Sequence, residues 1–162
     1  MAMTVLSWLL AIPVLGLCTG LRTMTPIALV CWYAWGGYLP VHDTWAFWAA
    51  KPITVGIFTL LALGEFIGDK LPSTPSRIAL FPLLARLSFG GLVGAIVATG
   101  LKGSALEGII LGVIGAVIGA FGGFHLRRHL VQNAGWPDLR VALIEDGITL
   151  VLSFFALGIV TG

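Results

Sequence analysis

Charged residues are scarce in this sequence. Lys, Arg, Asp and Glu make up 10% of its 162 residues, whereas hydrophobic residues make up 58%. An ordinary soluble domain contains about 25% charged residues. So little polar surface cannot solvate a globular protein in water, and lipid must therefore surround most side chains. The composition predicts an integral membrane protein with membrane lipid as its main partner.

A dense basic patch is also missing. The formal net charge is only +2, and long apolar runs separate the few Lys and Arg residues. Binding to a phosphate backbone requires clustered basic side chains. We therefore predict no nucleic-acid partner.

Motifs for cofactors, metals and covalent catalysis are absent as well. The sequence has no P-loop, no dinucleotide fingerprint and no nucleophile–base pair. Cys18 and Cys31 lie in apolar runs without a Cys-x-x-Cys pattern, which is typical of buried small hydrophobes. His125 and His129 are four residues apart, but no third ligand is evident, and anchoring at the membrane surface is the favoured interpretation. We predict no cofactor, no metal and no catalytic residue.

Long apolar runs dominate what is present. Charged and turn-rich interruptions divide the chain into runs near residues 3–20, 23–40, 53–69, 78–100, 104–124 and 140–161. At 1.5 Å per helical residue, runs of this length approach or exceed a hydrocarbon core of roughly 30 Å. The predicted fold class is therefore all-α, a single transmembrane domain over 1–162 with six membrane-spanning helices. For 23–40, which has Gly36-Gly37 near its end, a tilted or re-entrant segment is the alternative.

The basic residues predict an orientation, because cytoplasmic loops carry an excess of Lys and Arg. With six spans, one side of the membrane receives only Lys51 and Lys102, and the other receives Arg22, Lys70, Arg77, Arg127, Arg128 and Arg140. We predict a multi-pass protein of the bacterial inner membrane with both termini outside the cytoplasm. Aromatic residues between Trp32 and Trp48 crowd on the outer side, where aromatic rings settle at headgroup depth; a carbohydrate-binding platform is the alternative.

Two patterns concern packing. The third and fourth runs resemble the fifth and sixth, since Gly64-Glu65-Phe66 is echoed by Gly122-Gly123-Phe124 and Ala98-Thr99-Gly100 by Val160-Thr161-Gly162. This predicts an internal hairpin repeat, with a three-plus-three inverted repeat as the alternative. The fifth run also carries glycines at intervals of three or four: Gly108, Gly112, Gly115, Gly119 and Gly123. Such a stripe predicts close packing inside the bundle, or, as the alternative, the contact face of a homo-oligomer.

Charges within the apolar runs are the most informative residues, because each costs several kcal/mol in lipid unless it is paired or hydrated. They fall in the cytoplasmic half of four different spans under the predicted topology. This predicts a substrate-binding or ion-binding site made of Arg22, Thr25, Glu65, Asp69, Lys70, Arg86, Glu145 and Asp146. Arg86 is expected to pair with one of the four carboxylates in that set. Buried ion pairs that only fix helix register are the alternative.

One further segment offers polar groups. The loop from Lys70 to Arg77 places hydroxyls between two bases and could hold phosphate. It lacks the histidines of membrane lipid phosphatases and the paired aspartates of lipid-alcohol transferases, so a proline-rigidified loop is the favoured interpretation.

Three strings together resemble a known family: Gly20-Leu21-Arg22-Thr23-Met24-Thr25-Pro26, Gly64-Glu65-Phe66-Ile67-Gly68-Asp69-Lys70-Leu71-Pro72 and Ile144-Glu145-Asp146. The chain resembles small bacterial membrane proteins that carry the domain of unknown function 4126. The resemblance covers most of the chain, and its most specific part is the string from Glu65 to Pro72. It implies a membrane architecture and supplies no substrate. Its characteristic residues coincide with the charged cluster.

The sequence favours a small transporter or channel for a small polar solute or ion, with coupling to protons through the buried carboxylates. A membrane-embedded protein or enzyme that binds lipid headgroups is the first alternative, and a structural membrane subunit is the second. An enzyme is the less favoured class.

Overall fold

The computed structural model describes residues 2–71 and 76–162, with side chains described from residue 7 onward. These residues form α-helices and no strands. The helices are α1 (Ala2–Leu21), α2 (Met24–Trp35), α3 (Pro52–Gly68), α4 (Leu80–Gly100), α5 (Ala105–Arg128) and α6 (Asp138–Thr161). A 3-10 turn, η1 (Phe47–Ala50), precedes α3, and a π-helical turn, η2 (His129–Asn133), extends α5.

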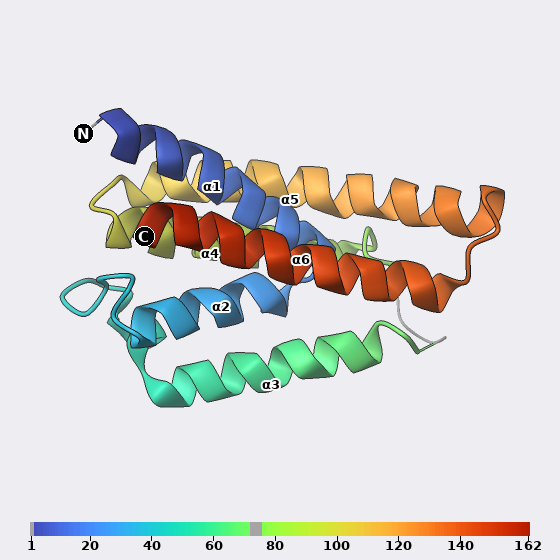
Figure 1. Cartoon of the computed structure of the whole chain (residues 1–162), viewed down its shortest axis with the longest axis horizontal. Helices are drawn as coiled ribbons and strands as arrows, with labels where there is room; N and C mark the ends of the chain where they lie inside the picture. The colour runs from blue at the N-terminus through green and yellow to red at the C-terminus, as the bar shows by residue number, and fades with distance from the viewer. Residues whose placement is uncertain (1, 72–75) are drawn as a thin grey trace.

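Successive helices run in opposite directions, so the bundle has two distinct ends (Figure 1). Both termini, the loop 36–51 and the loop 101–104 lie at one end, which we call the aromatic end. The α1–α2 turn, the last turn of α3, the first turn of α4 and the π-helical turn lie toward the other, which we call the charged end. The α1–α2 turn stops short of the far tip of α5, so it lies inside the bundle (Figure 1).

Helix boundaries follow local chemistry. Pro52 occupies the first position of α3, where its missing N–H costs nothing, and the Ser104 hydroxyl accepts from the Glu107 amide to cap α5. Gly37, which follows the end of α2, has a φ of 80°. Glycine adopts this left-handed conformation at little cost. Basic residues in the last turn of α5 interact favourably with the negative end of its helix dipole, and α5 extends beyond the predicted boundary at 124.

Within the described part of the chain, three helices are long and apolar enough to cross a membrane: Leu80–Gly100, Ala105–Asn133 and Asp138–Thr161. The other three apolar helices are shorter over their described side chains. The prediction of an all-helical chain is confirmed, whereas membrane-crossing length is confirmed for three of the six predicted spans. The predicted boundary of the second span was wrong: residues 36–40 are not helical, and the 12 residues of α2 cover about 18 Å.

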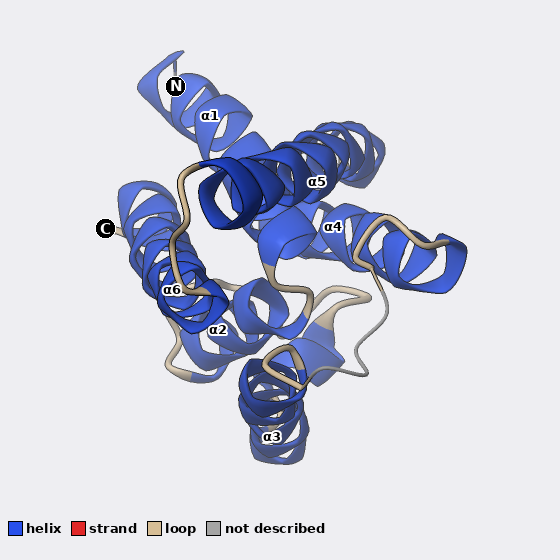
Figure 2. Cartoon of the chain, turned by 90° about the vertical axis from the view of Figure 1, so that its right-hand side faces the viewer, coloured by secondary structure: helices blue, strands red, loops and turns tan. Residues whose placement is uncertain are grey.

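The glycine stripe of α5 faces other helices of the same chain. Added Cβ atoms would overlap the backbone of α4 at Gly108 and Gly112, and the backbone of α1 at Gly115 and Gly119. A Cβ at Gly123 would meet side chains that cross toward α5. Viewed along the bundle, α1, α4 and α5 cluster together, with α2 and α6 beside them and α3 at the margin (Figure 2). The stripe therefore lets α5 approach α1 and α4 closely.

Candidate functional site

The turn between α1 and α2 holds the most deeply buried charge of the cluster. Arg22 lies in this turn, and its side chain is 0% exposed. Its guanidinium forms an ion pair with Asp69, which follows α3, and Nε lies 2.6 Å from Oδ1 of Asp146 in α6. A further N–H of Arg22 donates to the Ala142 carbonyl oxygen at 3.4 Å. One buried cation therefore connects the α1–α2 turn with α3 and α6.

Glu65 of α3 caps the start of α2. Its two carboxylate oxygens accept from the backbone amides of Thr23 and Met24, at 2.7 and 2.8 Å. The first amides of a helix have no partner within the helix, and α2 has no capping side chain of its own. A negative charge at this position also interacts favourably with the positive end of the helix dipole. Glu65 therefore holds the N-terminus of α2 against α3.

Arg86 of α4 makes the matching contact with the end of α1. Its Nη1 donates to the carbonyl oxygens of Gly20 and Leu21, both at 3.0 Å. The expectation that Arg86 forms an ion pair with a carboxylate of the cluster was wrong. Because α4 packs against α1 and α5, its arginine meets the unpaired carbonyls that end α1. The positive charge interacts favourably with the negative end of the α1 dipole.

The remaining charges form one connected set. Arg77 pairs with Glu145 through two hydrogen bonds, of 3.2 and 2.8 Å. Lys70 lies 2.7 Å from Asp146 and also donates to the Phe66 carbonyl oxygen at 2.6 Å. With the pairs of Arg22 and those of Arg127, these contacts define what we call the charge network: Arg22, Asp69, Lys70, Arg77, Arg127, Asp138, Glu145 and Asp146.

Arg127 joins several members of this network. Its Nε and Nη2 both donate to Asp138 at 2.8 Å, while Nη1 lies 3.1 Å from Asp69 and 3.5 Å from Glu145. Sequence reasoning did not place Arg77, Arg127 or Asp138 in the site. Its candidate set held four acids but only three bases, and this excess of carboxylates was a signal that further arginines were needed.

Thr25 was predicted to join the site, but it lies apart from the ion pairs. Its side chain is buried, and its hydroxyl has no hydrogen-bond partner among the described residues. It borders an apolar cavity of about 150 Å³ between α2, α3 and α6, together with Thr59 and Phe66. The central residues of the loop from Lys70 to Arg77, 72–75, lie outside the described part of the chain.

The charge network contains four bases and four acids, so its formal charge is zero. Three of its carboxylates, those of Asp69, Glu145 and Asp146, each contact two different basic side chains. If Asp69 is neutralised, both of its bases keep another acidic partner, because Arg22 also contacts Asp146 and Arg127 also contacts Asp138 and Glu145. Lys70 and Arg77, in contrast, each contact one carboxylate of the network, Asp146 and Glu145 respectively. The ion pairs of Arg22 and Arg127 can therefore rearrange while both arginines keep a carboxylate partner.

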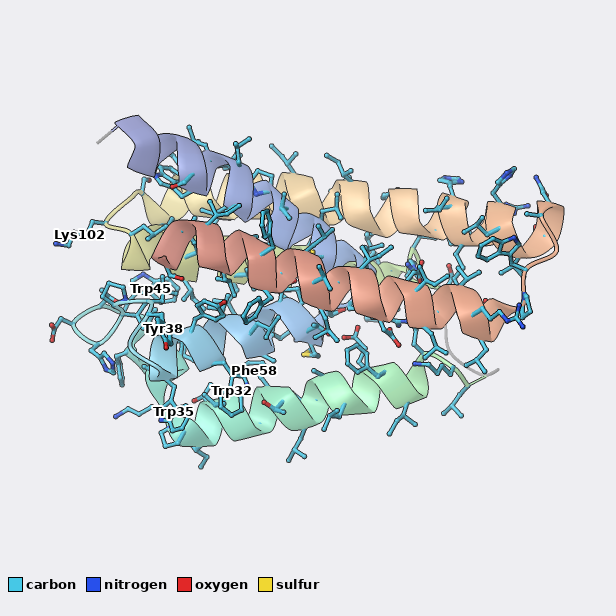
Figure 3. The ribbon with its side chains drawn as sticks, in the orientation of Figure 1. Trp32, Trp35, Tyr38, Trp45, Phe58 and Lys102 are labelled. Atoms are coloured by element: carbon cyan, nitrogen blue, oxygen red, sulfur yellow. The ribbon has the colours of Figure 1, made fainter. Side chains whose placement is uncertain are left out.

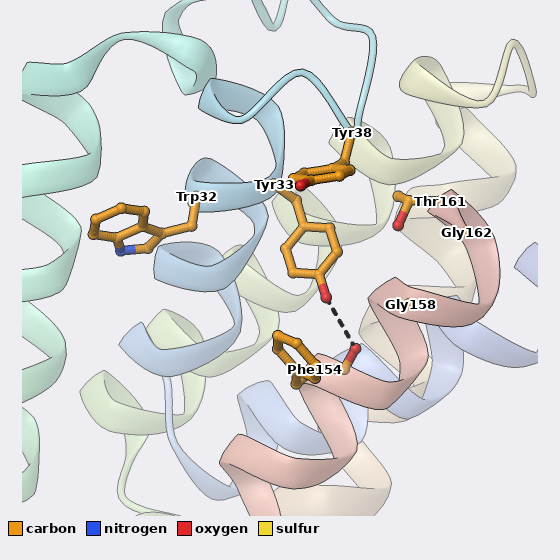
Figure 4. A pocket seen from close by; sticks show the side chains of 7 residues that line it. All are labelled: Trp32, Tyr33, Tyr38, Phe154, Gly158, Thr161 and Gly162. Atoms are coloured by element: carbon orange, nitrogen blue, oxygen red, sulfur yellow. Dashed lines mark hydrogen bonds between the residues drawn. The ribbon is translucent and has the colours of Figure 1, made fainter.

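The aromatic end has a different character. Trp32, Trp35, Tyr38 and Trp45 lie there with Lys102 (Figure 3). An open groove of about 470 Å³ lies between α2 and the end of α6, and the rings of Tyr33, Tyr38 and Phe154 border it (Figure 4). The Tyr33 hydroxyl donates to the Phe154 carbonyl oxygen at 3.4 Å. These aromatic residues and the charge network therefore lie toward opposite ends of the bundle.

Replacing Glu65 by glutamine should cost about 1 kcal/mol of folding free energy, because an amide oxygen still accepts a hydrogen bond but the charge at the α2 terminus is lost. Titration with a denaturing detergent, followed by circular dichroism, measures the change. Glu107→Gln is the matched control: Glu107 is exposed in the first turn of α5, where water screens the same charge–dipole interaction. Equal losses in both variants would refute a special role for the Glu65 cap.

Residues 9–159 match a protein family described as a domain of unknown function, DUF4126. No curated protein and no solved structure matches the chain. The matched range includes nearly all of the described helices and the whole charge network.

Proposed function

Because the chain belongs to the DUF4126 family, whose description names no activity, we propose a function from its geometry: a small membrane transporter or channel coupled to protons. Arg22 is the observation that carries this proposal. It is fully buried at a helix break, between carboxylates from two other helices. Charged groups within a membrane bundle commonly mark proton or ion pathways, and substrate sites commonly lie at the ends of interrupted helices.

Shared partners give the network a way to couple proton binding to movement. Protonation of Asp146 weakens its electrostatic attraction to both Arg22 and Lys70, whereas Arg22 keeps its ion pair with Asp69. Because Asp146 belongs to α6 and Arg22 to the α1–α2 turn, this change loosens one helix from another. The proposed consequence is a small rearrangement of α6 that admits a small polar solute or ion.

The proposal includes a topology. In it, all six helices form one membrane domain of a bacterial inner membrane, the charged end faces the cytoplasm and both termini lie outside. The distribution of arginines supports this orientation, because Arg127 and Arg128 end α5, Arg140 lies in the first turn of α6 and Arg77 precedes α4. These helix ends lie toward the charged end (Figure 1). The aromatic residues at the opposite end suit the outer interface.

Asp146→Asn should reduce proton flux at least tenfold in liposomes that contain the purified protein. The amide keeps the shape of the carboxylate but cannot carry a proton at neutral pH. A pH-sensitive dye inside the vesicles reports the flux after an acid jump outside. Asp43→Asn is the control, because Asp43 is an exposed acid in the loop at the aromatic end.

The same experiment distinguishes a transport role of the charge network from a purely structural role. A folded Asp146→Asn variant with wild-type proton flux would exclude Asp146 as the coupling group. Wild-type vesicles that conduct no more protons than empty vesicles would reject proton coupling altogether. Thermal unfolding of each variant in detergent shows whether a loss of flux reflects a loss of fold.

A further inference from the structure

A second polar feature lies on the outside of the charged end. A groove of about 340 Å³ opens there, and its lining includes Arg77, Phe124, Arg127, Arg128, Gln132 and Asp138. Three guanidinium groups and a single carboxylate border this groove, so its rim is basic. The side chains come from α5, from the π-helical turn and from the residues that precede α4 and begin α6.

The arginines of the groove are not equally engaged. Arg77 and Arg127 are committed to carboxylates of the charge network. Arg128 is exposed and donates through Nε to the Gln132 side-chain oxygen at 3.1 Å. Among the described residues, no carboxylate pairs with it. An arginine has five N–H donors in a planar fork that suits a phosphate group, so Arg128 keeps donors for an anion.

An exposed apolar stripe continues from this arginine along α5. Counting back from Arg128 in steps of three or four residues gives Phe124, Phe121, Val117 and Ile114, which therefore share one helix face. The last three are 40, 39 and 50% exposed. This face is opposite the buried glycine stripe. Ten residues separate Phe124 from Ile114, about 15 Å along the axis, which is half of a hydrocarbon core of roughly 30 Å.

We propose that this groove binds the headgroup of an anionic phospholipid, with the phosphate on Arg128 and Gln132 and an acyl chain along Phe124, Phe121, Val117 and Ile114. The basic rim matches the charge of the headgroup, and the stripe matches the length of a chain in one leaflet. A free phosphate ion would gain nothing from Phe124 or from the stripe. The π-helical turn that supplies Gln132 is a rare backbone form that often occurs at functional sites.

The proposed phosphate ligands, Arg128 and Gln132, lie outside the charge network, although the groove shares part of its lining with that network. The occupant of the groove would lie beside Arg77 and Arg127, which line the groove and bind Glu145 and Asp69. An anionic headgroup would thus bring a negative charge close to the network. Lipid composition would in this way influence the stability of its ion pairs.

Native mass spectrometry of the full-length protein in detergent tests the assignment with dioctanoyl phosphatidylglycerol as the probe. Wild-type protein should bind it more tightly than dioctanoyl phosphatidylcholine, whose headgroup has no net charge. Arg128→Gln should weaken phosphatidylglycerol binding about tenfold, since one charge-assisted contact is lost. Arg128→Lys, which retains the charge, should recover part of that loss.

Arg140→Gln is the matched control, because Arg140 is an exposed arginine at the same end that borders a different groove, beside Trp136 and Leu143. It should leave phosphatidylglycerol binding unchanged. Equal affinity for the two lipids, or wild-type affinity in Arg128→Gln, would overturn the proposal. Displacement of the lipid by an equal concentration of inorganic phosphate would also overturn it and would identify a free-anion site. Each result is a binding measurement, so it is independent of proton flux.

Discussion

Arg22→Leu is expected to lose about 3 to 5 kcal/mol of folding free energy, because removing one partner of a buried ion pair leaves the other charge uncompensated. Here two carboxylates are affected, those of Asp69 and Asp146. Lys70 and Arg127 still contact them, but neither occupies the enclosed volume that the guanidinium fills. Denaturing-detergent titration followed by circular dichroism measures the loss.

Arg140→Leu is the control for this prediction. It removes the same side chain from an exposed position in the first turn of α6, and should change stability by less than about 0.5 kcal/mol. A double variant that replaces Arg22 and Asp69 by apolar residues should be more stable than Arg22→Leu alone, because it restores equal numbers of acids and bases in the network. Asp146 then keeps Lys70 as its partner, and Arg127 keeps Asp138 and Glu145. If Arg22→Leu proves no less stable than Arg140→Leu, the charge network does not hold the bundle together.

Gly112→Ala is expected to cost about 3 kcal/mol, although it adds one methyl group. The added Cβ would overlap the backbone carbonyl of Gly90, and a backbone atom cannot move aside as a flexible side chain can. The helices α4 and α5 would have to separate and would lose packing along their length. Thermal unfolding in detergent measures the effect.

The same helix provides a matched control. A Cβ added at Gly122 meets nothing within 4 Å, so Gly122→Ala should be neutral or slightly stabilising, because alanine favours the helix over glycine. Similar unfolding temperatures for Gly112→Ala and Gly122→Ala would contradict the close packing of α4 and α5.

Helices were largely predictable from sequence, because apolar runs, glycine intervals and proline positions report on local structure. The six predicted runs correspond to the six α-helices, and the boundary at Gly100 is reproduced. The main error lies at the end of α2, where Trp35 is the last helical residue. The residues that follow it are aromatic and apolar, and hydropathy alone does not distinguish an interfacial loop from a buried helix.

Which helices and side chains contact one another was much less predictable from sequence. The position of Arg86 on its helix indicated that it points inward, but its partner depends on which helix lies beside α4. Because α1 packs against α4, the guanidinium of Arg86 donates hydrogen bonds to backbone carbonyl oxygens at the end of α1. Arg127 was missed for a related reason: it follows the apolar part of α5, and only the fold brings it to Asp69 and Glu145. The orientation, the internal repeat and the transported species stay predictions.

The helix break at Arg22 has a consequence for how the chain is made. Asp69 lies 47 positions after Arg22, and Asp146 belongs to α6, which follows α1 to α5 in the sequence. In the proposed six-span topology, the first two helices would therefore enter the membrane with an arginine whose two carboxylate partners have not yet been synthesised. Until α6 is synthesised, that charge would need water or lipid phosphate for compensation, which would favour a shallow or tilted position for the hairpin of α1 and α2. In that topology, synthesis of α6 would supply Asp146 as the second carboxylate partner of Arg22 and would allow the hairpin to take its place in the bundle.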